Sequence, residues 1–209
     1  MKKLLGFSIF LVFVLIASLT AEAKVTLPAI FSDNMVLQQN TQVNVWGKAA
    51  PGEKVTVKAS WLDKAVTAKA AANGKWTVKL KTPKAITNQS VTVSGENEIT
   101  INNVLIGEVW LCTGQSNMEF PVSRHPDVKW NTGMLNEAEE LKDADYPEIR
   151  LFHVKHQLAH EGELDDCEGE WLVCNPKNLY DFSAVGFVFG RKLYKAVSYT
   201  HLRAHETLS

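Results

Sequence analysis

Apolar and polar residues alternate along the first half of the chain. Five runs show this pattern: residues 42–46, 53–61, 75–80, 90–93 and 98–101. A period of two is typical of strands that bury one face and expose the other. Turn sequences separate the runs, and Asn73-Gly74 is a strong tight-turn dipeptide because both residues tolerate a positive φ. Short strands at this spacing predict a β-sandwich over residues 24–104.

Three tryptophans in these runs differ in phase. Trp61 and Trp76 alternate in step with their apolar neighbours, which predicts that both fill the core. Trp46 is out of step with Val43 and Val45 and is expected on the outer face. It is therefore the tryptophan of these runs to test as a stacking surface for carbohydrate.

The pattern changes after residue 104. Asn102-Asn103 is predicted to be the hinge into a second, α/β domain over residues 105–196. Val109–Cys112 is apolar without alternation, which predicts a strand buried on both faces in a parallel sheet. Ligands bind at the carboxyl ends of such strands, and the turn after this one contains Ser116. This serine is either a turn or capping hydroxyl or a nucleophile.

Four further elements are predicted downstream. A helix begins at Asn131 or Thr132 and runs to about Lys142, with Met134, Leu135, Ala138 and Leu141 on its inner face. The other three are a strand over 148–154, a loop over 166–178 and a helix over 182–195. Glu137, Glu139 and Glu140 are interpreted as a solvated helix face.

The first 23 residues predict export. They combine two lysines at the start, an apolar stretch too short to favour a membrane anchor, and Ala21-Glu22-Ala23 as a cleavage site. The mature protein is therefore expected in the periplasm or outside the cell, and not in the membrane. Cleavage changes the formal net charge from −1 to −2, which gives no reason to expect nucleic acid or an anionic membrane as partner.

The cysteines and histidines indicate little chemistry. Cys112 is interpreted as a packed thiol in the predicted strand. The spacing of Cys167 and Cys174 is compatible with a disulfide bridge and with two separate thiols, and both alternatives stay open. His153 and His156, three apart on an extended chain, point to opposite faces, which argues against a metal site.

Three segments resemble one known family. Residues 107–120, with Gly114-Gln115-Ser116-Asn117-Met118 at their centre, are similar to the nucleophile block of the sialate O-acetylesterase family, within the SGNH (GDSL-like) hydrolases. Residues 27–38 and 182–186 resemble other parts of that family. The resemblance implies a β-sandwich ahead of an α/β hydrolase domain with a parallel sheet, and Ser116 as catalytic nucleophile. It implies no metal or organic cofactor.

The resemblance implies an O-acetylated sugar as the partner and an ester hydrolase reaction. The sugar is left open between sialic acid and a plant polysaccharide such as xylan. A different class also stays open, a non-catalytic carbohydrate-binding fragment that uses Trp46. The oligomeric state is not predicted.

The resemblance covers only the amino-terminal part of such an enzyme. In this family the base and its orienting acid come from an Asp-x-x-His motif near the carboxyl end, and further oxyanion donors come from later loops. No Asp-x-x-His occurs in this sequence. Residues 197–209 resemble a translated sequencing adaptor, so the natural sequence is expected to end near Ala196. The chain as written is therefore expected to be truncated and to lack useful esterase activity.

Overall fold

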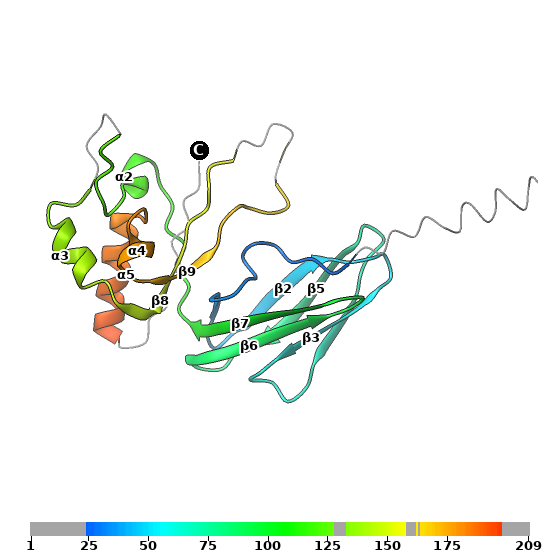
Figure 1. Ribbon diagram of the computed structural model, residues 1–209. Helices are drawn as coiled ribbons and strands as arrows, with labels where there is room; N and C mark the ends of the chain where they lie inside the picture. Colours follow the sequence, from blue (N-terminus) through cyan, green and yellow to red (C-terminus); the bar gives the residue numbers. More distant parts are fainter. Residues whose placement is uncertain (1–23, 128–132, 158–161, 163, 198–209) are drawn as a thin grey trace, which may run out of the picture.

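The computed structural model describes residues 24–127, 133–157, 162 and 164–197. It is mostly sheet with few helices, and the strands of the first half lie at one end while the helices gather at the other (Figure 1). The predicted signal peptide and all of the predicted tail (197–209) except Val197 lie outside the described residues, so both stay predictions. Among the residues that are described, no helix is long and apolar enough to cross a membrane.

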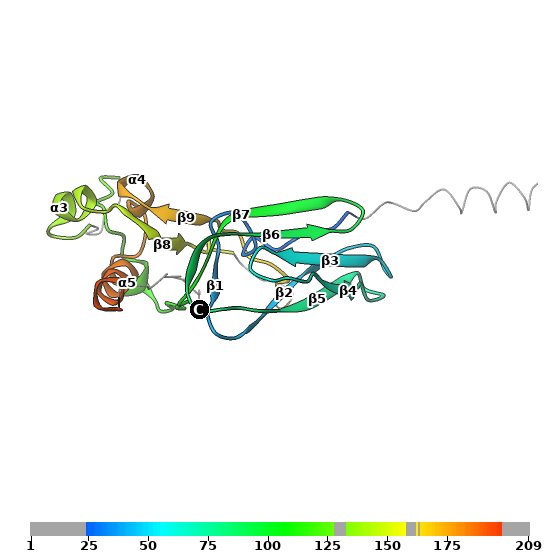
Figure 2. The ribbon, with the colours of Figure 1, turned by 90° about the horizontal axis from the view of Figure 1, so that it is seen from below.

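Seven strands make up the first half. They are β1 (Val36–Gln38), β2 (Gln42–Lys48), β3 (Lys54–Ala59), β4 (Val66–Lys69), β5 (Lys75–Lys81), β6 (Ile86–Ser94) and β7 (Glu98–Gly107). Five of them form a mixed sheet in the order β1-β7-β6-β3-β4, in which β1 and β7 are parallel and the other neighbours are antiparallel. The remaining two, β2 and β5, pair antiparallel as a separate ladder. From below, β2 and β5 lie on one side and β6 and β7 on the other (Figure 2).

The alternating pattern explains how these layers pack. In β5, Trp76, Val78 and Leu80 are buried, and the residues between them, Thr77 and Lys79, are exposed. These side chains share one core with the inward residues of the five-stranded sheet. Trp76 is thus in the core as predicted, Trp61 is half-buried against its edge, and Trp46 faces outward with 40% of its surface exposed.

The predicted hinge at Asn102-Asn103 lies inside β7, which continues to Gly107. Asn103 has a φ of 52°, a conformation that asparagine tolerates better than most residues, so the strand is distorted without ending there. The proposed division at residue 104 stays a prediction. The Asn73-Gly74 turn forms as expected, although of the two only Gly74 has a positive φ.

The described residues after β7 form two short strands and four helices. They are α2 (Ser116–Glu119), α3 (Glu137–Lys142), β8 (Tyr146–Phe152), β9 (Trp171–Cys174), α4 (Pro176–Leu179) and α5 (Ala184–Val197). β8 and β9 pair antiparallel, so no parallel pair is found in this half of the described chain. A second core of Ile149, Leu179, Phe187 and their neighbours lies between these elements.

Several expectations for this half are wrong. Val109–Cys112 is not a strand, because no strand of the described residues lies beside it to complete a ladder. The region 166–178, predicted as a loop, contains β9 and α4. The helix predicted to reach Lys142 starts only at Glu137, and Leu135, placed on its inner face, is fully exposed; its predicted start at 131 or 132 lies outside the described residues.

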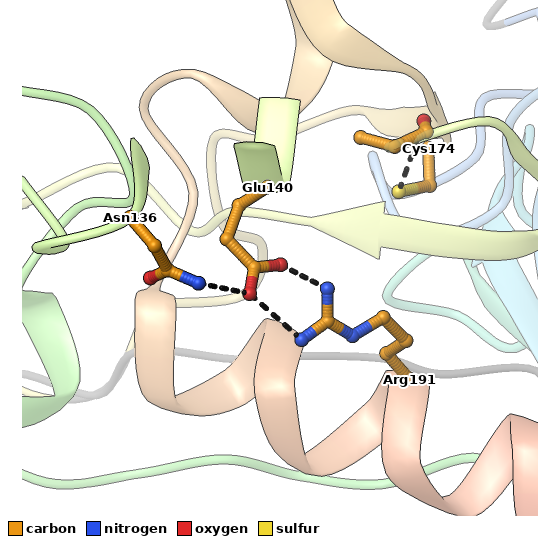
Figure 3. Close-up of polar contacts among 5 residues, drawn as sticks. Asn136, Glu140, Cys174 and Arg191 are labelled. Atoms are coloured by element: carbon orange, nitrogen blue, oxygen red, sulfur yellow. Dashed lines mark hydrogen bonds and ion pairs between the residues drawn. The ribbon is translucent and has the colours of Figure 1, made fainter. Parts of the chain in front are cut away.

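Glu140 corrects another expectation, that the acidic residues of α3 are all solvated. Its carboxylate forms a two-contact ion pair with the Arg191 guanidinium on α5 and accepts a hydrogen bond from Asn136 Nδ2 at 2.9 Å (Figure 3). The Arg191 hydrogen bond is the main reason that the pKa of Glu140 is held below its usual value. Glu140 is buried while its neighbour Glu139 is exposed, and the pair ties α3 to α5.

A polar network joins the two halves. Arg150 on β8 is buried and donates from Nη2 to Asn103 Oδ1 at 3.3 Å, and Asn103 Nδ2 donates to Asn34 Oδ1 at 2.7 Å. Asn34 in turn donates to the Trp171 carbonyl at 3.4 Å. Burial lowers the pKa of Arg150 to about 10. This network and the Trp171 indole, which donates to the Ile30 carbonyl at 2.8 Å, fix β8 and β9 against the first half.

No disulfide bond joins Cys167 and Cys174, which resolves the open question of a bridge between them. Cys174 is buried in β9, and desolvation raises the pKa of its thiol to about 12. Cys112 is half-buried, as a packed thiol would be, and burial raises its pKa as well.

Candidate active site

The segment that leads to Ser116 leaves the sheet at a polar clamp. Glu108 follows β7 directly, and its carboxylate accepts hydrogen bonds from Gln38 Nε2 at 3.0 Å and Gln39 Nε2 at 2.7 Å. These hydrogen bonds lower the pKa of Glu108, so it is ionised at neutral pH. The Val109 amide donates to Gln38 Oε1 at 2.9 Å. The glutamines at the end of β1 therefore fix the direction in which the chain departs.

Ser116 is the first residue of α2 and is exposed to solvent. The turn that contains it is closed by the Met118 and Glu119 amides, which donate to the Gln115 carbonyl at 2.8 and 3.1 Å. Gly114 makes this possible, because a Cβ there would lie 3.0 Å from the Cβ of Met118. The Ser116 hydroxyl has no hydrogen-bond partner among the residues that the structure describes. It is thus presented to solvent rather than used as a cap.

Helix α5 holds α2 in place. The Ser183 hydroxyl donates to Met118 Sδ at 3.4 Å and accepts from the Gly186 amide at 3.1 Å, and it is almost completely buried. The amide of the next residue, Ala184, donates to the Phe120 carbonyl at 2.8 Å. Ser183 and the first residue of α5 therefore hold the carboxyl end of the short helix that begins with Ser116.

An apolar hollow of about 310 Å³ lies between this segment and α5. Its wall includes Trp110 and Leu111 on one side and Val185 and Phe189 on the other, with Met118 from α2. The Trp110 and Phe189 rings meet edge to face at 5.3 Å. The predicted strand thus forms one wall of an open hollow instead of the middle of a sheet, and Trp110 and Leu111 are exposed.

Two histidines pair with carboxylates in this half, and neither contacts the Ser116 hydroxyl. His156 Nε2 lies 2.8 Å from Glu119 Oε1, and His125 Nε2 lies 3.0 Å from Asp181 Oδ1. Within the described ranges, no group of three or more His, Cys, Asp or Glu residues is placed to hold a metal ion. The arrangement therefore presents an exposed serine hydroxyl near an apolar surface, with no described histidine or carboxylate in contact with it.

Ser116 was singled out from the sequence as the candidate nucleophile, which stays a prediction, but the residues that position it were not. Ser183 and Gly186 were recognised only as part of a helix, and Glu108 was not singled out. The available signal was the helix over 182–195 itself, which is apolar nearly all round. Such a helix is expected to have neighbours on every side, and its amino-terminal turn meets the Ser116 segment.

The comparisons with known proteins agree with the resemblance seen in the sequence. The chain is 31% identical to the sialate O-acetylesterase of Mus musculus over 191 residues, and 28% identical to that of Homo sapiens over 187 residues. The alignments cover 82% and 80% of this chain, and each covers 34% of the relative, so the chain spans about a third of their length. No family model matches the chain.

A solved structure is also similar. A carbohydrate acetylesterase from Xanthomonas citri superposes with a TM-score of 0.77 at 29% sequence identity, over 87% of this chain and 40% of that protein. The mostly-sheet fold with few helices is therefore shared with an acetylesterase. The resemblance to the sialate O-acetylesterase family is confirmed, and the relatives are by name carboxylic ester hydrolases.

Proposed function

We propose that this relative of the sialate O-acetylesterases carries the nucleophile of an exported carbohydrate acetylesterase, and that the nucleophile is Ser116. The observation that supports this most is the exposed Ser116 at the start of α2, beside an apolar hollow, in a chain whose relatives are acetylesterases by name. In this proposal residues 24–104 form a β-sandwich and residues 105–196 the first part of an SGNH-like α/β domain.

The chemistry follows from the position of the hydroxyl. Ser116 Oγ attacks the carbonyl carbon of an acetyl ester while a base takes its proton. The tetrahedral intermediate collapses, the sugar leaves as a free hydroxyl, and the acetyl group stays on Ser116. Water then attacks the acetyl-enzyme and releases acetate. The apolar hollow beside Ser116 suits the acetyl methyl group, which gains by leaving water.

The lack of a described base in contact with Ser116 sets the activity that we expect. No residue in the described part of the chain accepts a hydrogen bond from the Ser116 hydroxyl, and loss of a triad member costs ~10⁴- to 10⁶-fold in rate. We therefore expect purified residues 24–209 to release no measurable acetate from O-acetylated sugars. Ester hydrolysis by this chain that disappears in Ser116→Ala would refute that expectation.

The nucleophile itself is tested in the protein that the source gene encodes. Long-read sequencing of the source gene across codons 190–209 defines the reading frame, and the protein it encodes is assayed for acetate release. We expect activity that falls at least ~10⁴-fold in Ser116→Ala, whereas Ser94→Ala on β6 leaves it unchanged. Full activity in Ser116→Ala would exclude Ser116 as nucleophile.

The sugar is decided by the same assay. The mammalian relatives are named for sialate and the Xanthomonas citri protein for carbohydrate in general. We propose an O-acetylated sialic acid or related sugar as substrate, with acetylated xylan as the alternative. The substrate with the higher kcat/KM identifies the class, because this ratio measures discrimination between competing substrates.

A further inference from the structure

A second hollow lies on the outer face of the first half. It has a volume of about 340 Å³, and its lining comes from four segments: residues 26–28, β2, β5 and residues 165–166. On the ladder, Trp46 is paired with Thr77 and Lys48 with Lys75, and all four face outward. It shares no lining residue with the hollow beside Ser116.

Trp46 forms an aromatic wall of this hollow. Its side chain is 40% exposed although the preceding residue, Val45, is fully buried, because successive residues on a strand face opposite sides. The Phe31 ring, itself buried, meets Trp46 edge to face at a centroid distance of 4.6 Å and an angle of 82°. The indole is thus held in position before any ligand arrives, which lowers the entropy cost of binding to it.

The rim of the hollow supplies charged groups of both signs. Asp165 lies 3.1 Å from Lys48 Nζ and 2.7 Å from Lys75 Nζ, and Asp166 accepts from the Ala29 amide at 3.1 Å. Each side chain of the Lys48–Asp165–Lys75 group is more than half exposed. Ion pairs this open to water contribute little to stability, so their donors and acceptors can be shared with a ligand at low cost.

The charges in this hollow balance. Two lysines and two aspartates line it, so its formal charge is zero. A pyranose ring matches such a surface: its C–H face packs on an aromatic ring, whose face is electron-rich, and its hydroxyls both donate and accept hydrogen bonds. The balance gives no preference for a carboxylated sugar, whose charge would add to that of Asp165 and Asp166.

We propose that this hollow binds a neutral pyranose unit of a glycan, which stacks on Trp46 and hydrogen-bonds to Asp165 and the two lysines. The site goes beyond the ester hydrolysis proposed above, because it holds the polysaccharide at a place separate from Ser116. A bound chain would raise the local concentration of ester groups near the same molecule.

The test measures binding of defined sugars to the purified chain by isothermal titration calorimetry. The probes are xylohexaose, cellohexaose and mannohexaose, with 3′-sialyllactose as the charged comparison. We expect at least one neutral hexasaccharide to bind more tightly than the sialylated probe. We expect Trp46→Ala to raise its Kd about tenfold or more, as loss of a central aromatic contact commonly does.

Trp110→Ala is the matched control, because Trp110 is also 40% exposed and also meets a phenylalanine edge to face at 82°. Trp110→Ala and Ser116→Ala should both bind the sugar like the wild type. The binding proposal is therefore tested independently of the esterase proposal. Asp165→Asn, on an exposed loop, should weaken binding several-fold and serves if Trp46→Ala does not fold.

Three outcomes would overturn the proposal. One is that none of the neutral probes binds, and another is that 3′-sialyllactose binds best. The third is that folded Trp46→Ala and Asp165→Asn bind as well as the wild type while Trp110→Ala does not, which would place the sugar at the Ser116 hollow.

Discussion

The Glu140–Arg191 ion pair gives a stability prediction that can be worked out from its geometry. The two side chains are 10% and 19% exposed, and the Arg191 guanidinium also lies 4.8 Å from the centroid of the Phe187 ring. Pairs in open solvent are worth ~0.2–1 kcal/mol, and removing one partner of a fully buried pair costs ~3–5 kcal/mol. We therefore expect Glu140→Gln and Arg191→Met each to lower the free energy of unfolding by ~2 kcal/mol.

The double variant separates the pair from its surroundings. Once both charges are gone, neither is left buried alone. The loss in unfolding free energy of the double variant should therefore be smaller than the sum of the two single losses by ~1–1.5 kcal/mol. The assay is urea unfolding at pH 7, followed by circular dichroism and by tryptophan fluorescence. Glu139→Gln, the exposed neighbour on α3, makes the same change in net charge and should cost less than ~0.5 kcal/mol.

The pH dependence of the coupling has a fixed sign. The pKa of Glu140 is lower in the folded protein than in the unfolded chain, where it is near 4.5. The folded state therefore binds fewer protons in this range, and the contribution to stability is fully present above pH 4.5 and is lost as the pH falls through the folded pKa. A coupling below ~0.3 kcal/mol at pH 7, or one that persists unchanged at pH 2, would refute this reasoning.

Three further predictions concern single side chains. Trp76→Ala should lower the free energy of unfolding by ~3–5 kcal/mol, because the buried ring leaves a cavity, whereas Trp76→Phe should cost far less; equal costs in chemical denaturation would contradict this. Cys174, buried and with a pKa raised to about 12, should react with iodoacetamide at pH 8 only after urea unfolds the chain, and fast labelling of the native chain, located by peptide mass spectrometry, would show that β9 is not packed. Ser116→Ala should change the free energy of unfolding by less than ~0.5 kcal/mol, since the hydroxyl is exposed and without a described partner; a larger loss in urea unfolding would mean that Ser116 is a structural residue.

The sequence predicted the first half well because one face of each strand is buried. In β5, Lys75-Trp76-Thr77-Val78 alternates in burial as it does in polarity, so the period of two fixes both the strand and its inner face. The same argument placed Trp46 outside. Strands β1 and β4 were missed, since three or four residues are too few to show a period.

The second half was harder to predict for physical reasons. An apolar run such as Val109–Cys112 has no period. It indicates that the segment is buried, but it does not indicate which segment it pairs with. The helix α4 did have a signal, Asn175 as cap and Pro176 as first residue, and the Asn175 side chain accepts from the Asn178 amide at 2.9 Å. Nothing in the sequence marks Glu140 as the partner of Arg191, because the contact depends on the packing of α3 against α5.

The same limit applies to the candidate site. Ser116 was found through a resemblance, and the exposed turn in which it lies was expected from Gly114. The way the chain reaches that turn was not: the expected central strand is an irregular segment fixed by Glu108, Gln38 and Gln39. A hydrogen-bonded clamp between residues about 70 positions apart leaves no local pattern in the sequence.

The parallel pairing of β1 with β7 has a consequence for how the protein is made. Val36 lies opposite Leu105, so the strand that is synthesised first finds its partner only after the rest of the sheet has emerged. Closing a loop of this length is slow compared with forming the hairpins inside it. During synthesis and any passage across a membrane, Val36 and Leu37 therefore remain an unpaired apolar edge, open to a chaperone or to a second copy.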